Sequence, residues 1–312
     1  MTKRNLYVFI LVFPALLQTV YGQVNANWPN QEDMFFTVNP AMTADARSLS
    51  IGIAHGRRWN KIKSSPSQSS LAARVPFRNQ KMAIGAHVFS DKVGPLAGNG
   101  IDLAYAYRFS TGLSRQDGLS LGMSIRFMQI SFDRSHLLAS REDDPLFDNV
   151  DPKKVVPPSL NIGFKYATGA TDYYNPVQMI FAASVDRFLP FEDRFNSLSI
   201  DHTLQWNGMI ALNIAASQTI SLAPSLLMSN SDQSVFNYAF RLKTTFKNQG
   251  WLMTQISKAG FLTTQIGFKL GESQQTGSVF SLSASNSWYF GTLATQLGNS
   301  TTFGLCYSQP IR

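Results

Sequence analysis

Segments of about ten residues in which apolar and polar side chains alternate fill most of the sequence. The clearest one runs from Leu119 to Phe127, where Leu, Leu, Met, Ile and Phe are separated by Ser, Gly, Ser and Arg. Because successive side chains of a strand point to opposite faces, this period of two predicts β-strands with a single apolar face. Soluble strands usually have about 5–6 residues, whereas a tilted strand needs about 9–11 to cross a bilayer. The segment length therefore favours a transmembrane β-barrel.

About fourteen such segments can be assigned, an even number as is usual for bacterial barrels. They span residues 47–58, 66–76, 81–90, 99–110, 118–131, 158–168, 177–187, 198–212, 218–229, 234–247, 250–257, 260–270, 277–291 and 299–308. We therefore expect residues 47–312 to form one all-β domain, an antiparallel transmembrane barrel of about 14 strands in the outer membrane. Its two longest connections, 133–158 and 188–197, are expected to be extracellular.

The composition agrees better with a barrel than with a secreted β-sandwich, which is the alternative for the same period. Charged residues make up 15% of the chain, well under the roughly 25% of ordinary soluble domains. The polar face of the segments is rich in Gly, Ala and Ser, whereas a face exposed to water normally carries many Lys and Glu. Aromatic residues at the segment ends fit the girdles of membrane barrels. These residues are Tyr107, Phe109, Tyr166, Trp206, Trp251, Trp288 and Tyr289.

The N-terminus has the pattern of a secretory signal peptide. Lys3 and Arg4 precede an apolar run that is too short to span a bilayer, and small residues follow it. Residues 1–22 are therefore predicted to be removed on export. The exported chain has a single cysteine, Cys306, so it cannot form an internal disulfide bond.

Residues 23–46 separate the signal peptide from the first strand. They contain the apolar stretch 34–38, which is followed directly by Asn39 and Pro40. Proline has no N–H and restricts the residue before it to extended conformations, so it can redirect the chain before the wall begins. We expect residues 23–46 to be a periplasmic, plug-like segment that enters or covers the mouth of the barrel.

Charged residues are scattered singly on the polar face of the segments. In a barrel this face lines the lumen, and opposite charges there can pair across neighbouring strands. The predicted lumen-facing charged residues are Arg74, Asp102, Arg108, Arg126, Lys165, Asp186 and Asp201. The net charge of the chain is +8, but no basic run is interleaved with aromatic residues as a nucleic-acid groove requires. The charge fits lipid head groups or an acidic partner better.

The sequence shows no pattern that points to catalysis, a metal ion or a cofactor. Its four histidines are not spaced like metal ligands. His202 follows Asp201 directly, and adjacent strand residues point to opposite faces, so these side chains cannot form a catalytic dyad. The acidic run 142–144 lacks the regular ligand spacing of a calcium loop. The protein is therefore predicted not to be an enzyme, with an outer-membrane hydrolase as the alternative from that class.

Several motifs in the N-terminal part of the chain resemble one known family. Residues 39–41 read NPA and precede a strand that ends in RW at 58–59. Residues 79–85 read NQKMAIG, and residues 90–95 read SDKVGP. This order is similar to that of the PorP/SprF family of Bacteroidetes outer-membrane proteins, which belongs to the type IX secretion and gliding motility machinery. The chain departs from the family at 299–303, where NSTTF replaces a strand of the Gly-Ser-His-Glu type.

The resemblance implies a non-enzymatic outer-membrane barrel that supports export or surface anchoring of a cognate cargo protein or adhesin. Its partners would be that cargo, other type IX secretion components and outer-membrane lipid. The residues expected to bind a partner are Asn39, Pro40, Arg58, Trp59, Asp91, Lys92, Gly94 and Pro95. Residues 91–95 can equally be a plain turn, since Gly and Pro set turn backbones. An outer-membrane pore or solute transporter of the same architecture is the alternative function.

Overall fold

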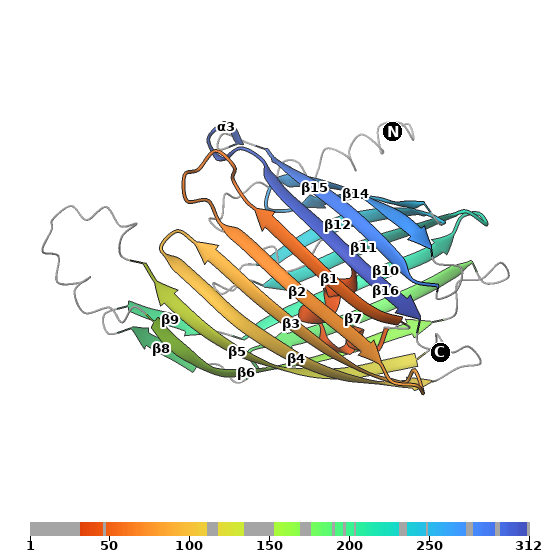
Figure 1. The fold of residues 1–312 in the computed structure, drawn as a ribbon, viewed down its shortest axis with the longest axis horizontal. Coiled ribbons are helices and arrows are strands. Elements are labelled where there is room, and N and C mark those ends of the chain that lie inside the picture. The colour runs from red at the N-terminus through yellow and green to blue at the C-terminus, as the bar shows by residue number, and fades with distance from the viewer. Residues whose placement is uncertain are drawn as a thin grey trace, which may run out of the picture.

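The computed structural model describes residues 32–45, 48–110, 118–133, 153–168, 176–188, 191–195, 198–202, 204–230, 236–247, 249–272, 277–290 and 294–310. Within these residues the chain forms a closed barrel with a short segment inside it (Figure 1). The predicted signal peptide, 1–22, and the acidic run 142–144 lie outside the described residues. No helix in the described part of the chain is long and apolar enough to span a membrane.

The wall has fourteen strands, which confirms the expected all-β, antiparallel transmembrane barrel. The strands are β1 (Ser48–Arg57), β2 (Ser67–Pro76), β3 (Met82–Val93), β4 (Leu96–Ser110), β5 (Gly118–Phe132), β6 (Lys153–Thr168), β7 (Val177–Asp186), β10 (Gln205–Ala215), β11 (Ile220–Asn230), β12 (Phe236–Phe246), β13 (Gly250–Ser257), β14 (Phe261–Glu272), β15 (Val279–Tyr289) and β16 (Ser300–Pro310). Each strand pairs with the next in this order, and β16 pairs with β1, so the ladder of hydrogen bonds closes on itself.

The two ends of the barrel differ in the connections that they carry. Ser48 at the start of β1 pairs with Pro310 at the end of β16, so the wall begins and ends at the same rim, which we call the termini end. The opposite rim, which we call the loop end, carries the long connections from β5 to β6 and from β7 to β10. In Figure 1 the loop end lies to the left, where β8 and β9 project. Barrels of this class usually carry their longer loops on the extracellular side.

One predicted strand, 198–212, is wrong because the chain leaves the wall within it. Leu198–His202 form β9, which pairs with β8 (Phe191–Phe195) in a separate two-stranded sheet, and the wall resumes at Gln205 in β10. Asp201 therefore lies in β9, and its prediction as a residue of the barrel wall is wrong. Apolar residues keep the same parity on both sides of this break, so the period alone does not reveal it.

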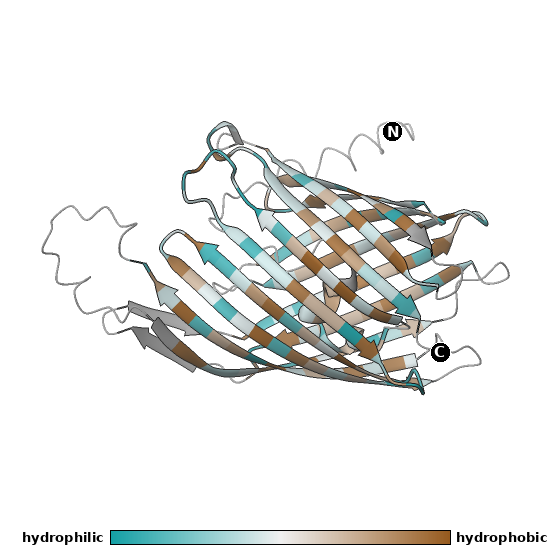
Figure 2. Cartoon of the chain, viewed as in Figure 1, coloured by the Kyte–Doolittle hydropathy of each residue, from teal (hydrophilic) through white to brown (hydrophobic). Residues whose placement is uncertain are grey.

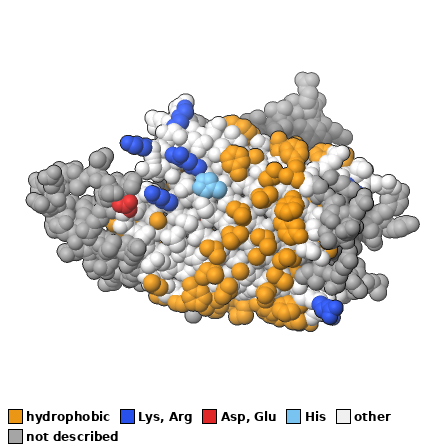
Figure 3. All heavy atoms as spheres, in the orientation of Figure 1, with side chains coloured by type: hydrophobic (Ala, Val, Ile, Leu, Met, Phe, Trp, Pro, Cys, Tyr) orange, Lys and Arg blue, Asp and Glu red, His pale blue; other side chains and the backbone are white. Residues whose placement is uncertain are grey.

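The apolar face of the strands points outward. Its side chains are well exposed, for example Ile53 at 53%, Phe240 at 60% and Phe303 at 62%. Figure 2 shows the alternation of hydrophobic and hydrophilic residues along the strands, and Figure 3 shows hydrophobic side chains spread over the middle of the wall. A soluble monomer rarely carries such a large exposed apolar surface, whereas a barrel in lipid requires one.

Two of the strand-end aromatic residues point into the lumen, which corrects their expected place on the apolar face. The ring of Trp251 lies 5.4 Å from Nζ of Lys243, a residue that lines a cavity in the lumen. The hydroxyl of Tyr289 lies 3.0 Å from that of Ser300, which is buried. Each of the two aromatic residues directly adjoins an outward-pointing residue, so alternation along the strand places it inside.

Three short helices are found among the described elements. Two 3-10 helices, η2 (Glu32–Thr37) and η3 (Pro40–Asp45), precede the wall and lie inside the barrel. A four-residue α-helix, α3 (Ala294–Leu297), lies in the connection between β15 and β16 at the loop end.

Candidate functional site

The stretch of chain before β1 occupies part of the lumen. We call residues 32–45, which comprise η2 and η3, the lumen segment. The helix η3 contacts the inner faces of β3, β4, β5 and β6. The wall residues that it approaches lie in the half of the barrel nearer the termini end. The side chains of residues 34–36 and 38–44 are almost completely buried.

Asn39 fixes the middle of the lumen segment to the wall. Its Nδ2 donates hydrogen bonds to the backbone oxygens of Phe164 on β6 (3.1 Å) and Ala183 on β7 (3.2 Å). Its Oδ1 accepts a hydrogen bond from the backbone N–H of Ala41 (3.0 Å), which caps the start of η3. Pro40 occupies the first position of that helix, where an N–H has no intrahelical partner. Both polar groups of the Asn39 side chain, Nδ2 and Oδ1, thus form hydrogen bonds. The residue is completely buried.

The wall beneath Asn39 and Pro40 is built of small residues. Along one rung of the sheet, the residues paired across β3 to β7 are Ala83, Ala106, Gly122, Gly163 and Ser184. A Cβ on Gly122 would overlap the backbone of Pro40, and a Cβ on Gly163 would overlap the side chain of Asn39. The hydroxyl of Ser184 donates to the backbone oxygen of Val38 at 2.7 Å. The close approach of the lumen segment therefore requires glycine at these two wall positions.

Apolar side chains pack the lumen segment against the wall. Phe36 is 1% exposed, and a Cβ on Gly85 would lie 2.8 Å from its ring. The guanidinium of Arg74 lies 5.9 Å from the ring of Phe36, and that of Arg241 lies 5.0 Å from the ring of Phe35. The wall contributes mainly alanine to this core. Its members are Ala72, Ala104, Ala167, Ile180, Ala182, Met209, Ala211, Leu227 and Ala239. Burial of a phenylalanine contributes roughly 1.5–3 kcal/mol, so Phe35 and Phe36 help to keep the segment inside.

Two ion pairs hold the C-terminal end of the lumen segment. The carboxylate of Asp45 lies 2.5 Å from Nζ of Lys165 on β6 and 2.9 Å from Nη2 of Arg108 on β4. Arg108 also donates to the backbone oxygen of Ala44. Burial by itself raises the pKa of Asp45, but the charges of Lys165 and Arg108 outweigh this effect and leave the pKa below its ordinary value. Asp45 is therefore ionised at neutral pH.

A second charged cluster lies in the lumen, further toward the loop end. Arg126 on β5 contacts both carboxylate oxygens of Asp102 on β4, at 2.6 and 2.9 Å. His87 on β3 places its Nδ1 3.1 Å from the same carboxylate. The guanidinium of Arg126 also lies 5.3 Å from the ring of Phe89. Bidentate contacts of this kind are strong and directional, so the cluster ties three neighbouring strands together.

The predicted lumen-facing charged residues have two different roles, apart from Asp201, which lies outside the wall. Arg74, Arg108 and Lys165 contact the lumen segment, whereas Asp102, Arg126 and Asp186 contact other wall residues. Arg74 donates to the backbone oxygen of Met42 at 3.2 Å. Asp186 accepts a hydrogen bond from Nδ2 of Asn207 at 3.2 Å. Charges that the sequence suggested for cross-strand pairing are thus partly used to hold a segment inside the barrel.

The residues predicted to bind a partner fall in two separate places. Asn39 and Pro40 are buried in the lumen, so a partner could reach them only if the lumen segment moved. The other six lie at the loop end, after β1 and around the turn between β3 and β4. They are Arg58, Trp59, Asp91, Lys92, Gly94 and Pro95. Gly94 has a φ of 59° and forms, with Pro95, the two-residue turn that joins these strands.

Sequence reasoning did not single out the residues that receive the lumen segment. The most important of these are Ser184 on β7 and Arg241 on β12, together with the small residues of the rung described above. His87, in the second cluster, was also missed. The available signal was the excess of Gly and Ala on the polar face, because small residues leave space inside a barrel.

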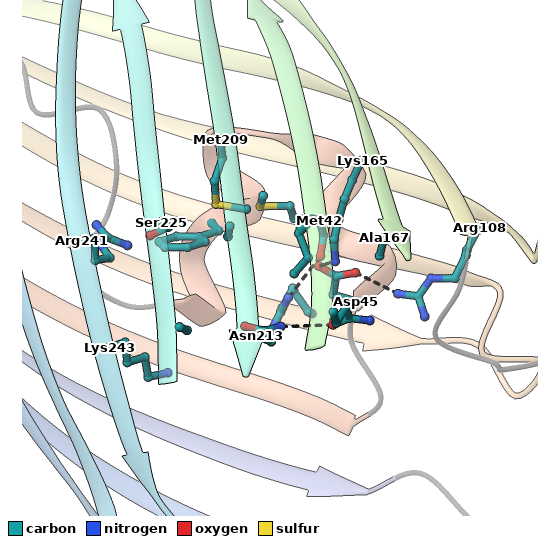
Figure 4. Close-up of a pocket in the computed structure, with 16 residues that line it drawn as sticks. Met42, Asp45, Arg108, Lys165, Ala167, Met209, Asn213, Ser225, Arg241 and Lys243 are labelled. Carbon is teal, nitrogen blue, oxygen red and sulfur yellow. Dashed lines mark hydrogen bonds and ion pairs between the residues drawn. The ribbon is translucent and has the colours of Figure 1, made fainter. Parts of the chain in front are cut away.

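A cavity of about 300 Å³ remains in the lumen beside the lumen segment. Figure 4 shows Arg241 and Lys243 on one side of it and Asp45, Lys165 and Arg108 on the other. The remaining lining comes from Phe35 and Met42 of the lumen segment, from Arg74 on β2 and Ala167 on β6, and from residues of β7, β10 and β11. Among the described residues, no group of three or more His, Cys, Asp and Glu is placed to hold a metal ion.

Comparison with known proteins gives one matching family and a shared fold. The family model for the type IX secretion system membrane protein PorP/SprF matches residues 30–307. A solved Pseudomonas aeruginosa FadL homologue is similar in fold, with a TM-score of 0.54 and 9% identity, over 92% of this chain and 96% of that one. The CymD monoaromatic hydrocarbon channel is similar with a TM-score of 0.54 and 8% identity, over 92% of this chain and 95% of that one. No curated protein sequence matches the chain. At such low identities, the solved structures show a shared outer-membrane barrel fold and nothing finer.

Proposed function

The chain belongs to the PorP/SprF family of type IX secretion system membrane proteins, and from this membership we propose that it supports export or surface anchoring of a cognate cargo protein or adhesin. It acts as a non-enzymatic barrel in the outer membrane of a member of the Bacteroidetes, after its signal peptide is cleaved. Its partners are that cargo and other components of the type IX system, which serves secretion, gliding motility or both.

The lumen segment is the observation that most supports this proposal. Residues 32–45 are held at once by the Asn39 amide, by apolar packing and by the ion pairs of Asp45. A barrel whose lumen is partly occupied by its own chain, packed against β3 to β6, is poorly suited to free passage of solutes. The docked segment provides a fixed scaffold in the lumen, and the loop end is left to bind a protein.

The loop-end rim is the place where cargo binds in this proposal. It includes Arg58 and Trp59 after β1, and Asp91, Gly94 and Pro95 around the turn between β3 and β4. In the part of the chain that the structure describes, Nε1 of Trp59 and Oδ1 of Asp91 are buried without a hydrogen-bond partner. Buried polar atoms are nearly always paired in folded proteins, so these two atoms favour a rearrangement of the rim, on binding cargo, that gives them hydrogen-bond partners.

A solute pore or transporter is the second candidate function. It is favoured by the cavity of about 300 Å³ and by the fold shared with the CymD channel. The two candidates differ in what the intact protein does in planar bilayers. The proposed secretion role predicts no stable conductance with the lumen segment in place, whereas a pore or transporter predicts steady conductance or solute flux.

A gene deletion in the native host, followed by labelling of surface proteins, tests the proposal. We expect one or a few large exported proteins to disappear from the cell surface and to return when the wild-type gene is restored. In detergent extracts of native membranes, an affinity-tagged barrel should bring down the same protein. An unchanged set of surface proteins, combined with reduced uptake of a solute, would rule out the secretion role and favour the transporter.

A further inference from the structure

The outward face of β1, β2 and β3 changes from apolar to polar and cationic toward the loop end. Ile53, Leu71 and Val88 are paired across these three strands and form an apolar rung. Their side chains are 53%, 45% and 48% exposed, as expected for residues that contact lipid. This rung is the last one on these strands, counted toward the loop end, in which all three side chains are large and apolar.

The next two outward rungs are polar and then cationic. His55 pairs with Ser69 one rung beyond the apolar one, and their side chains lie 2.9 Å apart. One rung further, Arg57 of β1 pairs with Ser67 of β2, which pairs in turn with Lys92 of β3. Arg57 and Lys92 are both exposed. Since neighbouring strands lie about 4.8 Å apart, the Cα atoms of these two cations are roughly 10 Å from each other.

The three strands themselves supply no acidic residue on this face, whereas the exposed Asp133 follows β5 beside the turn, its backbone N–H donating to the oxygen of Pro95 at 2.8 Å. Within the described strands β1, β2 and β3, the outward positions carry neither Asp nor Glu. Arg57 donates to the hydroxyl of Ser65 at 2.5 Å, and among the described residues neither Arg57 nor Lys92 forms an ion pair. Lys63, in the connection after β1, adds a further exposed cation. Figure 3 shows Lys and Arg side chains gathered on this side, next to the hydrophobic band, with one acidic side chain beside them.

The depth of the cationic rung matches the head groups of a bilayer. Two residues along a strand advance it by about 6.7 Å, so Arg57 lies roughly 13 Å along the strand beyond Ile53. With a strand tilt of about 35–45°, this corresponds to roughly 10 Å along the membrane normal. The head-group layer extends about 5–8 Å beyond the hydrocarbon core. Arg and Lys side chains can bend toward the membrane over several ångströms, which places their charges at the phosphates.

We propose that Arg57 and Lys92 bind the phosphate groups of an anionic lipid in the leaflet at the loop end. Guanidinium and ammonium groups are the side chains that bind phosphate best. Near the same rim, β10, β12 and β15 carry the outward aromatic residues Trp206, Phe236 and Trp288. Lys258, which follows β13, differs from Arg57 and Lys92 because its Nζ donates to the backbone oxygen of Phe236 at 2.9 Å. Lys92, which the sequence placed among the partner-binding residues, is thereby assigned to lipid. This inference goes beyond the proposed function and does not depend on a cargo.

Native mass spectrometry of the full-length barrel in detergent tests the site. The probes are a lipid with two phosphates, diphosphoryl lipid A, and the zwitterionic lipid phosphatidylethanolamine. We expect binding of the diphosphorylated lipid to fall about fivefold for each of Arg57→Gln and Lys92→Gln, and about 25-fold for the double variant. Arg57→Lys should retain most of the binding, because the charge is kept. Binding of phosphatidylethanolamine should not change in any of them.

The matched control removes the same charges at the opposite rim. Arg78 and Lys81 are exposed residues in the connection between β2 and β3 at the termini end. The double variant Arg78→Gln, Lys81→Gln should bind the diphosphorylated lipid like the wild type. Equal losses in the two double variants would show that overall charge attracts the lipid, and the site would not exist. Undiminished lipid binding in the Arg57→Gln, Lys92→Gln variant, whether or not it loses a co-purifying protein, would also overturn the proposal. Heat-modifiable migration on gels confirms that each variant is folded.

Discussion

Nζ of Lys165 lies 2.5 Å from the carboxylate of Asp45, and this ion pair joins strand β6 to the last residue of the lumen segment. The side chain of Asp45 is 29% exposed and that of Lys165 is 11% exposed, so water screens the pair only in part. Arg108 contacts the other carboxylate oxygen. Since β1 begins at Ser48, the ion pairs hold the segment where it joins the wall, and Asn39 holds it in the middle.

Asp45→Asn should loosen the lumen segment and leave the barrel intact. The amide keeps its size but brings no charge, so Lys165 and Arg108 repel each other without a counter-ion. Breaking a fully buried pair costs about 3–5 kcal/mol, and for this partly exposed one we expect roughly 2 kcal/mol. Thr43 is completely buried. In a Cys306→Ser background, a Thr43→Cys reporter should therefore react with maleimide about 30-fold faster when Asp45→Asn is added. Equal rates would mean that the ion pairs do not hold the segment.

Docking of the lumen segment should weaken in acid. The pKa of Asp45 in the docked segment lies below the ordinary 3.8, because the cations outweigh the effect of burial. A released segment therefore takes up a proton first. The stabilisation by Asp45 is complete above about pH 4 and is lost as the pH falls through the lowered pKa. Hydrogen exchange of residues 32–45, corrected for the intrinsic effect of pH, should stay constant down to about pH 4 and then increase. The same increase in Asp45→Asn would assign the effect to other carboxylates.

Asn39→Asp should release the lumen segment at neutral pH. The substitution removes both Nδ2 hydrogen bonds and directs a carboxylate oxygen at the backbone oxygens of Phe164 and Ala183. The loss of two buried hydrogen bonds and the added repulsion should cost roughly 2–4 kcal/mol. Thr37→Val is the matched control, because it removes a hydrogen bond that stays within the segment, to the backbone oxygen of Met34. Limited proteolysis should cleave the segment of Asn39→Asp and spare that of Thr37→Val. Resistance of both variants would contradict the role assigned to the Asn39 amide.

Gly122→Ala and Gly163→Ala should each displace the lumen segment from a folded barrel. The added methyl groups would overlap Pro40 and Asn39, which can move with the segment, while the strands stay paired. Gly98→Ala is the control, since its Cβ would meet only Sδ of Met128, at an ordinary 3.7 Å. All three proteins should show heat-modifiable migration, and the maleimide reporter should react faster only in the first two. If Gly98→Ala behaves like the others, the effect lies in the wall and not in the segment.

The wall could be predicted from the sequence because lipid imposes a constraint on every second residue. The alternation from Leu119 to Phe127 predicted a strand at 118–131, and β5 spans Gly118–Phe132. A lipid-facing position needs an apolar side chain wherever it lies along the strand, so the period survives without any knowledge of the partner strands. The break inside 198–212 could not be detected in this way. The strand β9 lies outside the wall, but its apolar residues occupy even-numbered positions like those of β10, so the alternation continues across the break.

The wall residues that contact the lumen segment could not be predicted, because their proximity depends on the register between strands. Gly122 and Gly163 are far apart in the sequence and become neighbours only through the pairing of β5 with β6. The apolar stretch 34–38 and the break at Asn39 and Pro40 did indicate a segment that leaves the wall. The sequence does not predict that the Asn39 amide donates to two backbone oxygens of the wall. Every residue has a backbone carbonyl, so the acceptors leave no signal in the sequence.

Deleting residues 32–45 should separate the role of the lumen segment as a plug from a role in holding cargo. The segment is no part of the hydrogen-bonded ladder that closes the fourteen strands, so we expect the shortened protein to migrate as a folded barrel. Its lumen would lose the apolar core around Phe36 and the ion pairs of Asp45. In planar bilayers we therefore expect discrete conductance steps that the wild-type protein does not show.

The comparison with Asn39→Asp decides what the segment does for cargo. That variant keeps every residue of the segment but should release it from the wall, so it should conduct like the deletion. If the segment only closes the lumen, both proteins should conduct and both should retain cargo at the cell surface. If the released segment also contacts a partner, cargo should be lost from the deletion alone. Should neither protein conduct nor lose cargo, the lumen segment is only a tether, because occupying the lumen would then block no ion flow and support no partner.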